Sequence, residues 1–589
     1  MQRNIRSAVI ALVCIIFLSA CHSLPEHTRY IPGDASMVVG VNIKEIGKSL
    51  TWSAIKGSKL LDEMKEKAKD AKGKSMIDGI ENSGIDWMNT VYIYTKPDKR
   101  FLGDTKTSLV APLSDAKEWE TYLKKIYPEI VIKKVKDRSE VMLEDKIYAS
   151  WNSEVLIVMN TVTQDVQHEE KAVLPETTTS DTALAAAIAD AANEMPAYKW
   201  TEKLTDTAAS LAEMEASFNI AKEASIVDNQ RFKDIQKENN DISVYMSYDA
   251  VMSNLGQDKG MMAGMGAMLM NSSIWKNAAM TTAINFEDGK IVADMKYFPS
   301  DSLKNIAKEA GKENIDKDML ARIPAQKLNF AMGYHLAPQI LKMMLDRLNL
   351  TGMANMALTE AGTNVDEILG AFTGDMTLSL NEFAVNKVTI TPDNSMSALP
   401  GEPQVQPYED YKPQMSVLFA IKVKDKAKLD KLLEMVQKQT GVAPTATGAY
   451  QFPLSGQDSV NILINDKYII VANKMAAAVA YQGNNSGSAS DVISKEIAGH
   501  PVGMYFDISS VLSTVDPGMI GGKKDAAMMN DVKSLLSGLK MNGGEFKGDA
   551  NVYHAELVFT NKTENSLIQL LNFAQRMAAL QKDKSVAQR

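Results

Sequence analysis

The sequence predicts an α+β protein in which one strand-and-helix unit occurs twice. Short apolar strands mix with helical stretches and are joined by hairpin turns, which favours largely antiparallel sheets over regular βαβ crossovers. Three kinds of segment, which we call A, B and C, follow one another in the same order in both halves of the chain. Because a repeated order of matching segments is typical of a duplication, the 589 residues are expected to contain two related halves.

Segment A begins with an Ile-Pro pair and a short apolar strand that leads into a helix. This strand contains Gly40 in the first copy and Gly333 in the second. Further on, Asp86 and Asp366 precede a second apolar strand in their copies. Each copy of segment A is therefore expected to supply two strands.

Segment B begins with an apolar strand that runs into an amphipathic helix. Asp115 and Asp425 stand where the N-cap of this helix belongs. The segment closes with a hairpin around Asn152 in the first copy and Asn465 in the second. Asparagine suits this place because it tolerates the positive backbone dihedral of tight hairpin turns.

Segment C begins with an apolar strand that ends at Asp249 in the first copy and at Asp507 in the second. A later strand ends at Phe298 and Phe559, respectively, and a helix follows each of them. The order A, B, C is then complete in both halves.

The spacing between matching residues changes at two places, which locates two insertions. Residues 163–240 have helical composition and are expected to form a helical insertion, and residues 391–413 are expected to form a Pro-rich, solvated loop. The expected domains are a signal peptide at 1–20, a tether at 21–30, a first α+β repeat at 31–310, a second α+β repeat at 322–578 and a polar tail at 579–589.

The N-terminus has the layout of a secretory signal. Arg3 and Arg6 precede an apolar run that is shorter than the roughly 20 residues of a spanning helix. The run ends at Leu18-Ser19-Ala20-Cys21, which resembles the lipobox of bacterial lipoproteins. This resemblance implies cleavage before Cys21 and attachment of diacylglycerol and palmitate chains to it, so that the mature chain is anchored to a membrane by lipid. The alternative is cleavage by the ordinary signal peptidase, with Cys21 incidental.

Composition excludes several classes of function. Cleavage removes Cys14, so Cys21 is the sole cysteine left, and no disulfide, cysteine nucleophile or thiolate metal site is expected. The net charge of −9 gives no basic surface for neutralising phosphates, and we expect no nucleic-acid partner.

Catalytic motifs are weak or absent. Ser53–Lys56 and Ser273–Lys276 fit the S-x-x-K pattern but lack the companion motifs S-D-N and K-T-G. The G-x-S-x-G, H-E-x-x-H and Walker patterns do not occur. Four histidines lie beyond the tether, and none has another histidine three or four residues on: His168, His335, His500 and His554. Of these, His554 alternates with apolar neighbours and is expected on the solvent side of a strand. We assign no catalytic residue, no metal site and no cofactor.

Methionine is unusually frequent, with 35 residues against 15 phenylalanines. It gathers with glycine in segment C of both halves. One interpretation is a core filler, because methionine adapts to irregular gaps, and the other is an adaptable apolar contact surface. The candidate surface comprises Met261, Met262, Met265, Met268, Met519 and Met528.

The stretch from Tyr30-Ile31-Pro32 through Ala-Ser-Met-Val-Val-Gly-Val-Asn resembles the Bacteroidales lipoproteins of the domain-of-unknown-function 4836 family. That resemblance implies an envelope lipoprotein and assigns no substrate, cofactor or catalytic residue. We therefore expect a non-catalytic binding or structural protein, lipid-anchored in the cell envelope, in the outer membrane by default and facing either the periplasm or the surface. Its expected partners are the membrane, through Cys21, and an envelope protein or apolar ligand. The alternative is an exported hydrolase acting on glycan or peptide.

Overall fold

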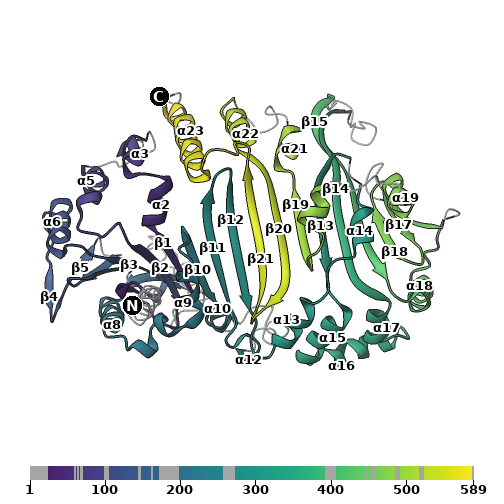
Figure 1. Ribbon diagram of the computed structural model, residues 1–589, viewed down its shortest axis with the longest axis horizontal. Helices are drawn as coiled ribbons and strands as arrows, with labels where there is room; N and C mark the ends of the chain where they lie inside the picture. The colour runs from purple at the N-terminus through teal and green to yellow at the C-terminus, as the bar shows by residue number, and fades with distance from the viewer. Residues whose placement is uncertain are drawn as a thin grey trace, which may run out of the picture. The chain divides into compact units, whose positions relative to one another are not determined.

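The computed structural model describes most of the chain from residue 24 onward. The described residues are 24–58, 61–62, 65–66, 71–97, 105–143, 147–160, 163–170, 198–255, 272–324, 326–391, 406–445, 448–453, 459–483, 491–515 and 523–586. They form helices and antiparallel sheet, which confirms the α+β class (Figure 1).

Two compact units make up the chain. Unit 1 comprises residues 1–40 and 75–233, and unit 2 comprises residues 41–74 and 234–589. This division does not follow the two halves expected from the sequence, because segment C of the first half belongs to unit 2.

In unit 1, antiparallel strands follow one another in the order β2-β3-β7-β6-β5-β4. β8 and β9 pair separately. The elements are η1 (Glu26–Tyr30), the first part of β1 (Met37–Asn42), α5 (Ala71–Gly79), which starts in unit 2, η2 (Ile80–Asn82), β2 (Thr90–Pro97), β3 (Thr105–Pro112), α6 (Ala116–Ile126), β4 (Lys133–Val135), β5 (Arg138–Leu143), β6 (Ile147–Trp151), β7 (Val155–Asn160), β8 (Thr163–Glu170), β9 (Tyr198–Thr205), α8 (Thr207–Phe218), η3 (Lys222–Ala224), η4 (Ile226–Asp228) and α9 (Gln230–Gln236), which ends in unit 2.

Unit 2 contains one antiparallel sheet in the order β10-β11-β12-β21-β20-β19-β13-β14-β15-β18-β17-β16. Its first helices and strands are α2 (Ile43–Ser49), α3 (Trp52–Lys56), β10 (Ile242–Ser247), α10 (Tyr248–Leu255), α12 (Ser272–Trp275), β11 (Ala279–Glu287), β12 (Lys290–Phe298) and α13 (Lys304–Ala310). Those that follow are α14 (Lys317–Ala321), β13 (Leu328–His335), α15 (Pro338–Arg347), α16 (Thr351–Thr359), α17 (Val365–Gly370), β14 (Phe372–Ile390), β15 (Tyr408–Val423), α18 (Lys426–Thr440), β16 (Ala449–Pro453), β17 (Ser459–Ile464), β18 (Tyr468–Ala472), α19 (Met475–Gly483), α20 (Asp491–Glu496), β19 (Val502–Phe506), α21 (Ile508–Ser513), α22 (Lys523–Leu535), β20 (Leu536–Lys547), β21 (Ala550–Phe559) and α23 (Ser566–Val586).

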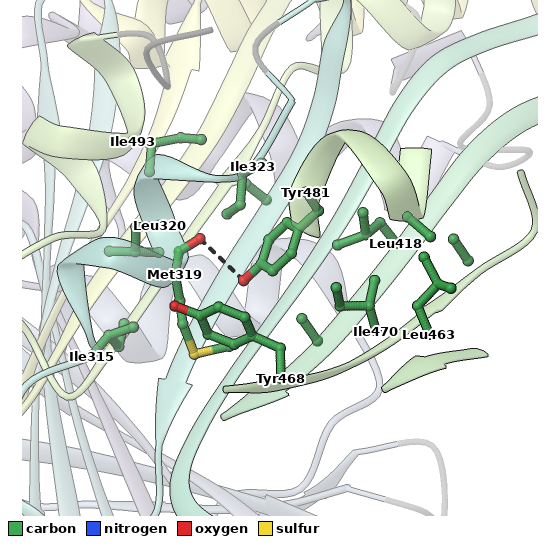
Figure 2. Packing of buried hydrophobic residues seen from close by; sticks show 14 of the residues in the cluster. Ile315, Met319, Leu320, Ile323, Leu418, Leu463, Tyr468, Ile470, Tyr481 and Ile493 are labelled. Carbon is green, nitrogen blue, oxygen red and sulfur yellow. Dashed lines mark hydrogen bonds between the residues drawn. The ribbon is translucent and has the colours of Figure 1, made fainter. Parts of the chain in front are cut away.

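The core of unit 2 lies between one face of β13, β15 and β18 and the helices α14, α19 and α20 (Figure 2). Tyr468 and Tyr481 meet edge to face with their ring centroids 5.8 Å apart, and both are almost fully buried. The Tyr481 hydroxyl donates to the carbonyl oxygen of Met319, 3.2 Å away, so a buried polar atom is satisfied where α19 packs on α14.

Both N-caps predicted for segment B are confirmed. Asp115 accepts hydrogen bonds from the backbone amides at the start of α6, and Asp425 does the same at the start of α18. The hairpin asparagines act differently from the expectation. Neither Asn152 nor Asn465 is among the described non-glycine residues with positive φ. Instead, each side-chain oxygen accepts two backbone amides of its own turn.

The tether expected at 21–30 is wrong from Glu26 onward, because η1 is folded into unit 1. The rings of His27 and Tyr30 are buried, and His27 Nε2 lies 2.7 Å from the carbonyl oxygen of Thr90. The Tyr30 ring packs against that of Phe218. Two isolated rings form no periodic pattern, and therefore nothing in the sequence distinguished this segment from a tether.

The two insertions also differ from expectation. Residues 163–240 contain α8 and α9 but also the strands β8 and β9, so the insertion is not purely helical. The Pro-rich loop is shorter than 391–413, because β15 starts at Tyr408 and Pro413 pairs with Val385. Proline is tolerated there because β15 pairs with β18 only from Leu418 onward, which leaves no second ladder to receive an N–H at Pro413. At the C-terminus, α23 extends to Val586, into the expected polar tail.

Candidate functional site

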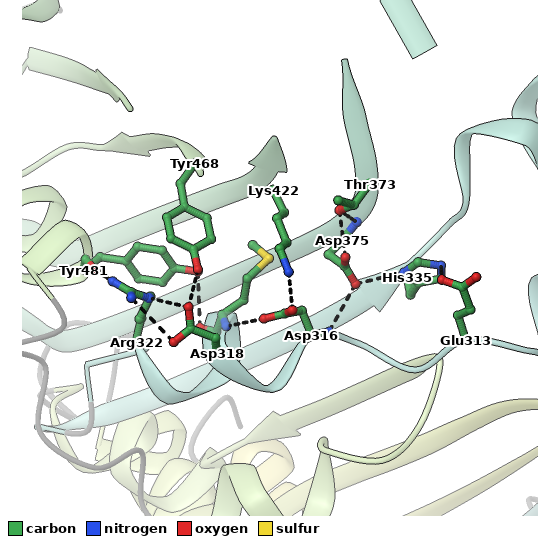
Figure 3. Close-up of polar contacts among 11 residues, drawn as sticks. Glu313, Asp316, Asp318, Arg322, His335, Thr373, Asp375, Lys422, Tyr468 and Tyr481 are labelled. Atoms are coloured by element: carbon green, nitrogen blue, oxygen red, sulfur yellow. Dashed lines mark hydrogen bonds and ion pairs between the residues drawn. The ribbon is translucent and has the colours of Figure 1, made fainter. Parts of the chain in front are cut away.

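A polar cluster surrounds α14 in unit 2 (Figure 3); it is buried at His335 and Asp375 and exposed at Glu313. Its members come from the segment before α14, from α14 itself, and from β13, β14, β15, β18 and α19. They are Glu313, Asp316, Asp318, Arg322, His335, Thr373, Asp375, Lys422, Tyr468 and Tyr481.

His335 and Asp375 form the inner end of the cluster. His335 ends β13, where the strand alternates between buried and half-buried residues and places this ring on the buried face. Asp375 follows Gly374, which has φ +99° and on which a Cβ would lie only 2.1 Å from the Leu336 carbonyl oxygen. Glycine is therefore required before this aspartate. His335 Nδ1 lies 2.8 Å from Asp375 Oδ1, and both residues are at most 5% exposed.

The remaining atoms of Asp375 are also occupied. Its Oδ1 accepts the backbone amide of Asp316 at 3.1 Å, and its Oδ2 accepts the Thr373 hydroxyl at 2.7 Å. Burial acts most strongly on the pKa of Asp375 and would raise it, but the hydrogen bonds from His335 and Thr373 outweigh it and the pKa is lowered. Asp375 is therefore a carboxylate at neutral pH.

The second ring nitrogen of His335 has a different environment. Nε2 is buried, has no hydrogen-bond partner among the described residues and lies 3.5 Å from Glu313 Oε2. The hydrogen bond with Asp375 raises the pKa of His335, against the opposing effect of burial. A neutral ring places a bare lone pair toward a carboxylate, whereas a protonated ring places an N–H there. Protonation therefore strengthens the contact between β13 and the segment that precedes α14.

The outer end of the cluster centres on Arg322. Its Nη1 donates to the carbonyl oxygens of Tyr481 and Gln482 at 3.1 and 3.0 Å, and its Nε donates to Asp318 Oδ2 at 3.2 Å. The guanidinium lies 5.0 Å above the Tyr468 ring. The Tyr468 hydroxyl donates to Asp318 at 2.5 Å, and this bond is the main reason that the pKa of Asp318 is lowered.

Asp316 links the two ends of the cluster. Its carboxylate caps α14 by accepting the amide of Met319, and it forms an ion pair with Lys422 on β15. Asp316 thus joins the segment before α14 to the sheet, in addition to the bond between its backbone amide and Asp375.

These contacts hold the segment before α14 against the sheet. Among the described residues, no hydroxyl or thiol is hydrogen bonded to His335, so a nucleophile and base pair is not assembled there. The described part of the chain also holds no group of three or more His, Cys, Asp or Glu side chains placed to bind a metal ion.

A second histidine contacts the same segment. The amide of Ile315 donates to the carbonyl oxygen of His500, and the His500 ring pairs with Glu545 on β20. The remaining histidine of unit 2, His554, lies on β21 with a side chain that is 41% exposed and pairs with Asp294. This confirms its expected place on the solvent side of a strand.

Most of the sequence-predicted site residues lie outside the described part of the chain. These are Cys21, Met261, Met262, Met265, Met268 and Met519. Met528 is described: it lies on α22 and is 44% exposed. Sequence analysis missed the α14 cluster because its members come from separate strands. The available signals were local ones, such as the alternation that ends at His335 and the Gly-Asp pair at 374–375.

Comparison with protein families finds a match in the middle of the chain. Residues 191–398 match the family model described as "Domain of unknown function (DUF4836)". The segment includes His335 and Asp375, whereas Lys422, Tyr468 and Tyr481 lie beyond it. No curated protein matches the chain.

Three of the solved structures that resemble the chain are crystal forms of one protein, TP0453. Crystal form III matches 52% of this chain and 88% of that chain at 7% identity, with a TM-score of 0.23. Crystal form I matches 48% of this chain and 81% of that chain at 9% identity, with a TM-score of 0.22. At TM-scores this low the likeness carries no argument. Within the described residues, no helix combines the length and apolar character needed to cross a membrane.

Proposed function

We propose that this chain is a cell-envelope protein, tethered by lipid on Cys21, that acts by binding or as a structural component rather than by catalysis. The lipobox-like end of the signal segment supports the tether. The outer membrane is the proposed location, because His22 follows Cys21 in place of the aspartate that marks inner-membrane retention in enteric lipoproteins.

The proposal of a non-catalytic role is supported by the α14 cluster, whose ionisable side chains are bonded to groups of the chain itself. Its acids and bases bond to one another and to backbone groups: Asp375 to His335, Asp316 to Lys422, and Asp318 to Arg322. Groups bonded in this way hold the segment before α14 against the sheet. A catalytic site instead needs an acid, base or nucleophile directed at a place where substrate can enter.

We also infer that the two halves arose by duplication, and matching connections support this. The strand order β7-β3-β2 in unit 1 corresponds to β18-β15-β14 in unit 2, and β10-β11-β12 corresponds to β19-β20-β21. The turn bonds of Asn152 recur at Asn465. The last strands of the two halves, β12 and β21, pair with each other, with Ala293 opposite Ala555.

Local bonding favours a different residue match in two places. Ser247 accepts the amide three residues on, as Asp507 does, so Ser247 rather than Asp249 corresponds to Asp507. The carbonyl oxygen of Gly84 accepts the amide of Asp115, as that of Ala371 accepts the amide of Asp425. Segment A is therefore matched at Gly84 and Ala371 rather than at Asp86 and Asp366.

Membrane fractionation tests the tether. We expect the wild-type chain in the membrane fraction with incorporated fatty acid, and Cys21→Ser in the soluble fraction without it. A Cys21→Ser chain that stays in the membrane fraction after a salt wash would contradict the lipid anchor.

Affinity capture from solubilised envelope, with a tag after Arg589, tests the binding role. A reproducible partner supports that role, whereas hydrolysis of a glycan or peptide by the purified chain would overturn it.

A further inference from the structure

The sheet of unit 2 has one face on which apolar residues stand in register across neighbouring strands. Met541 on β20 lies opposite Met504 on β19, which in turn lies opposite Met332 on β13. Directly opposed residues point to the same face of a sheet. The row continues in both directions with apolar residues and runs Ala555, Met541, Met504, Met332, Leu378, Phe419.

A second row on the same face is also apolar. It lies two residues along each strand and runs from Leu557 on β21 to Val417 on β15. At its centre, the rings of Phe506 and Phe330 meet edge to face with centroids 6.3 Å apart. We call these two rows the apolar sheet face.

The opposite face of the same strands is either covered or charged. On β13, Ala331 is completely buried beneath the helices of the core. On β12, β20 and β21 the opposite face carries ion pairs, such as Lys290 with Glu556 and Lys540 with Glu496. Strands that alternate between charged and apolar residues are typical of a sheet whose apolar side is covered.

The apolar sheet face is not covered to that extent by the described part of the chain. Each of the six residues in the methionine row is half-buried rather than buried, as are Glu556 and Lys540 on the solvated face. A contiguous apolar face of this extent marks a binding surface in soluble proteins.

The charge and hydrogen-bonding capacity of this face indicate what covers it. Neither row contains a charged side chain, and the backbone groups of the strands bond to neighbouring strands on both sides. A protein partner forms about 10 hydrogen bonds across an ordinary interface, and these two rows offer no side-chain donor or acceptor for them. The hydroxyls of Tyr334 and Tyr553 lie in the adjoining row of the same face. An uncharged hydrocarbon chain is complementary to it.

Size and adaptability agree with a hydrocarbon occupant. Six strands at about 4.8 Å spacing give a row about 24 Å long. An acyl chain occupies half of the roughly 30 Å hydrocarbon core of a bilayer, so it fits along the row. Methionine side chains are flexible and polarizable and adjust to a chain without a fixed shape.

We propose that the apolar sheet face binds the acyl chain of a single lipid molecule. This rests on the binding role proposed above and specifies its ligand. The lipid is bound as a monomer, on the side of the sheet opposite to the α14 cluster.

Titration with a fluorescent long-chain fatty acid tests this in the mature chain carrying Cys21→Ser, prepared free of detergent. We expect saturable binding. Ala555→Asp and Met504→Asp should each weaken it at least tenfold, because a carboxylate on this face would be buried against hydrocarbon without a partner. Val552→Asp is the matched control, since Val552 lies on the other face of β21 beside Lys296, and it should leave affinity unchanged.

A photoreactive fatty acid on the unsubstituted face gives a result that does not depend on the folding of variants. Crosslinks should fall on peptides containing Met332, Met504 or Met541.

Three outcomes would each overturn the proposal: absence of saturable binding, equal losses of affinity in Ala555→Asp and Val552→Asp, or crosslinks elsewhere. Binding to phosphatidylcholine vesicles without binding of the monomeric probe would also overturn it, as would a dimer that Ala555→Asp dissociates while the probe fails to bind. None of these outcomes would overturn the broader binding role, which the affinity capture tests separately.

Discussion

His335 on β13 and Asp375 on β14 share a buried hydrogen bond of 2.8 Å, which joins the two strands where the segment before α14 crosses them. Asp375 accepts the amide of Asp316 from that segment, and Glu313 of the same segment lies beside the free nitrogen of His335. The protonation state of one ring therefore affects how firmly the segment is held.

The first prediction is that His335 makes the stability of the chain depend on pH. Its pKa is raised above 6.5, the ordinary value for histidine, so its stabilising contribution is complete below about pH 6.5 and is lost as pH rises through the folded pKa. The pKa of Asp375 is lowered from 3.8, so its contribution is present above that value and is lost as pH falls. We expect the urea concentration at the unfolding midpoint to decrease as the pH is raised from 6 to 8. His335→Gln should remove most of this decrease.

His554→Gln is the control for this measurement. The pKa of His554 is raised too, but its side chain is 41% exposed, and exposed ion pairs contribute little to stability. This variant should keep the pH dependence of the wild type. If His335→Gln kept it and His554→Gln lost it, the assignment to His335 would be wrong.

The second prediction concerns the fork of bonds made by Arg322. Arg322→Lys should lower the free energy of unfolding by about 1–3 kcal/mol, because an ammonium group cannot reach Asp318 and the two carbonyl oxygens of α19 in one planar arrangement. Tyr468→Phe removes only one of the bonds to Asp318 and should cost about 1 kcal/mol. Chemical denaturation measures both.

Arg576 provides the comparison for Arg322, because it pairs with Asp531 on the surface with a side chain that is 45% exposed. Arg576→Lys should change the stability by less than about 0.5 kcal/mol. Equal effects of the two Arg→Lys substitutions on the free energy of unfolding would show that the bonds of Arg322 stabilise the protein no more than a surface ion pair does.

The third prediction distinguishes side-chain bonding from backbone conformation in the hairpin turns. Asn465→Ala should destabilise the protein by about 1 kcal/mol, because the amides of Lys467 and Tyr468 lose their acceptor. Asn465→Asp retains an acceptor oxygen and should stay near the wild type, whereas Asn465→Gly should behave like the alanine variant. A glycine variant as stable as the wild type would instead indicate that backbone freedom matters at this turn.

Local sequence signals predicted the fold class and the helix starts well. Asp115 and Asp425 were recognisable because an N-cap bonds only to amides within its own first turn, so neighbouring residues contain the whole interaction. Antiparallel pairing was predictable for the same reason, since hairpin turns lie between strands that are adjacent in sequence.

Long-range bonding was beyond the reach of such signals. The bond between Tyr468 and Asp318 joins residues 150 positions apart, and nothing near either residue indicates the other. The folding of Tyr30 into unit 1 depends on a ring more than a hundred residues away, that of Phe218. The apolar sheet face became recognisable only once the register of β13, β19 and β20 was known, because methionines on separate strands form a row only in space.

The last prediction uses methionine oxidation to rank exposure and to detect the proposed ligand. Met356 is 70% exposed and Met528 is 44% exposed, so hydrogen peroxide should convert both to sulfoxide early. Met319 is fully buried and should react only when the core opens. Met504, which is half-buried in the methionine row, should react at an intermediate rate in the chain without ligand. If an acyl chain covers the row, a saturating fatty acid should slow the oxidation of Met504 and leave that of Met356 unchanged. Equal slowing at both residues would indicate a general effect of the fatty acid on the reagent, and unchanged oxidation of Met504 at saturation would place the bound chain elsewhere.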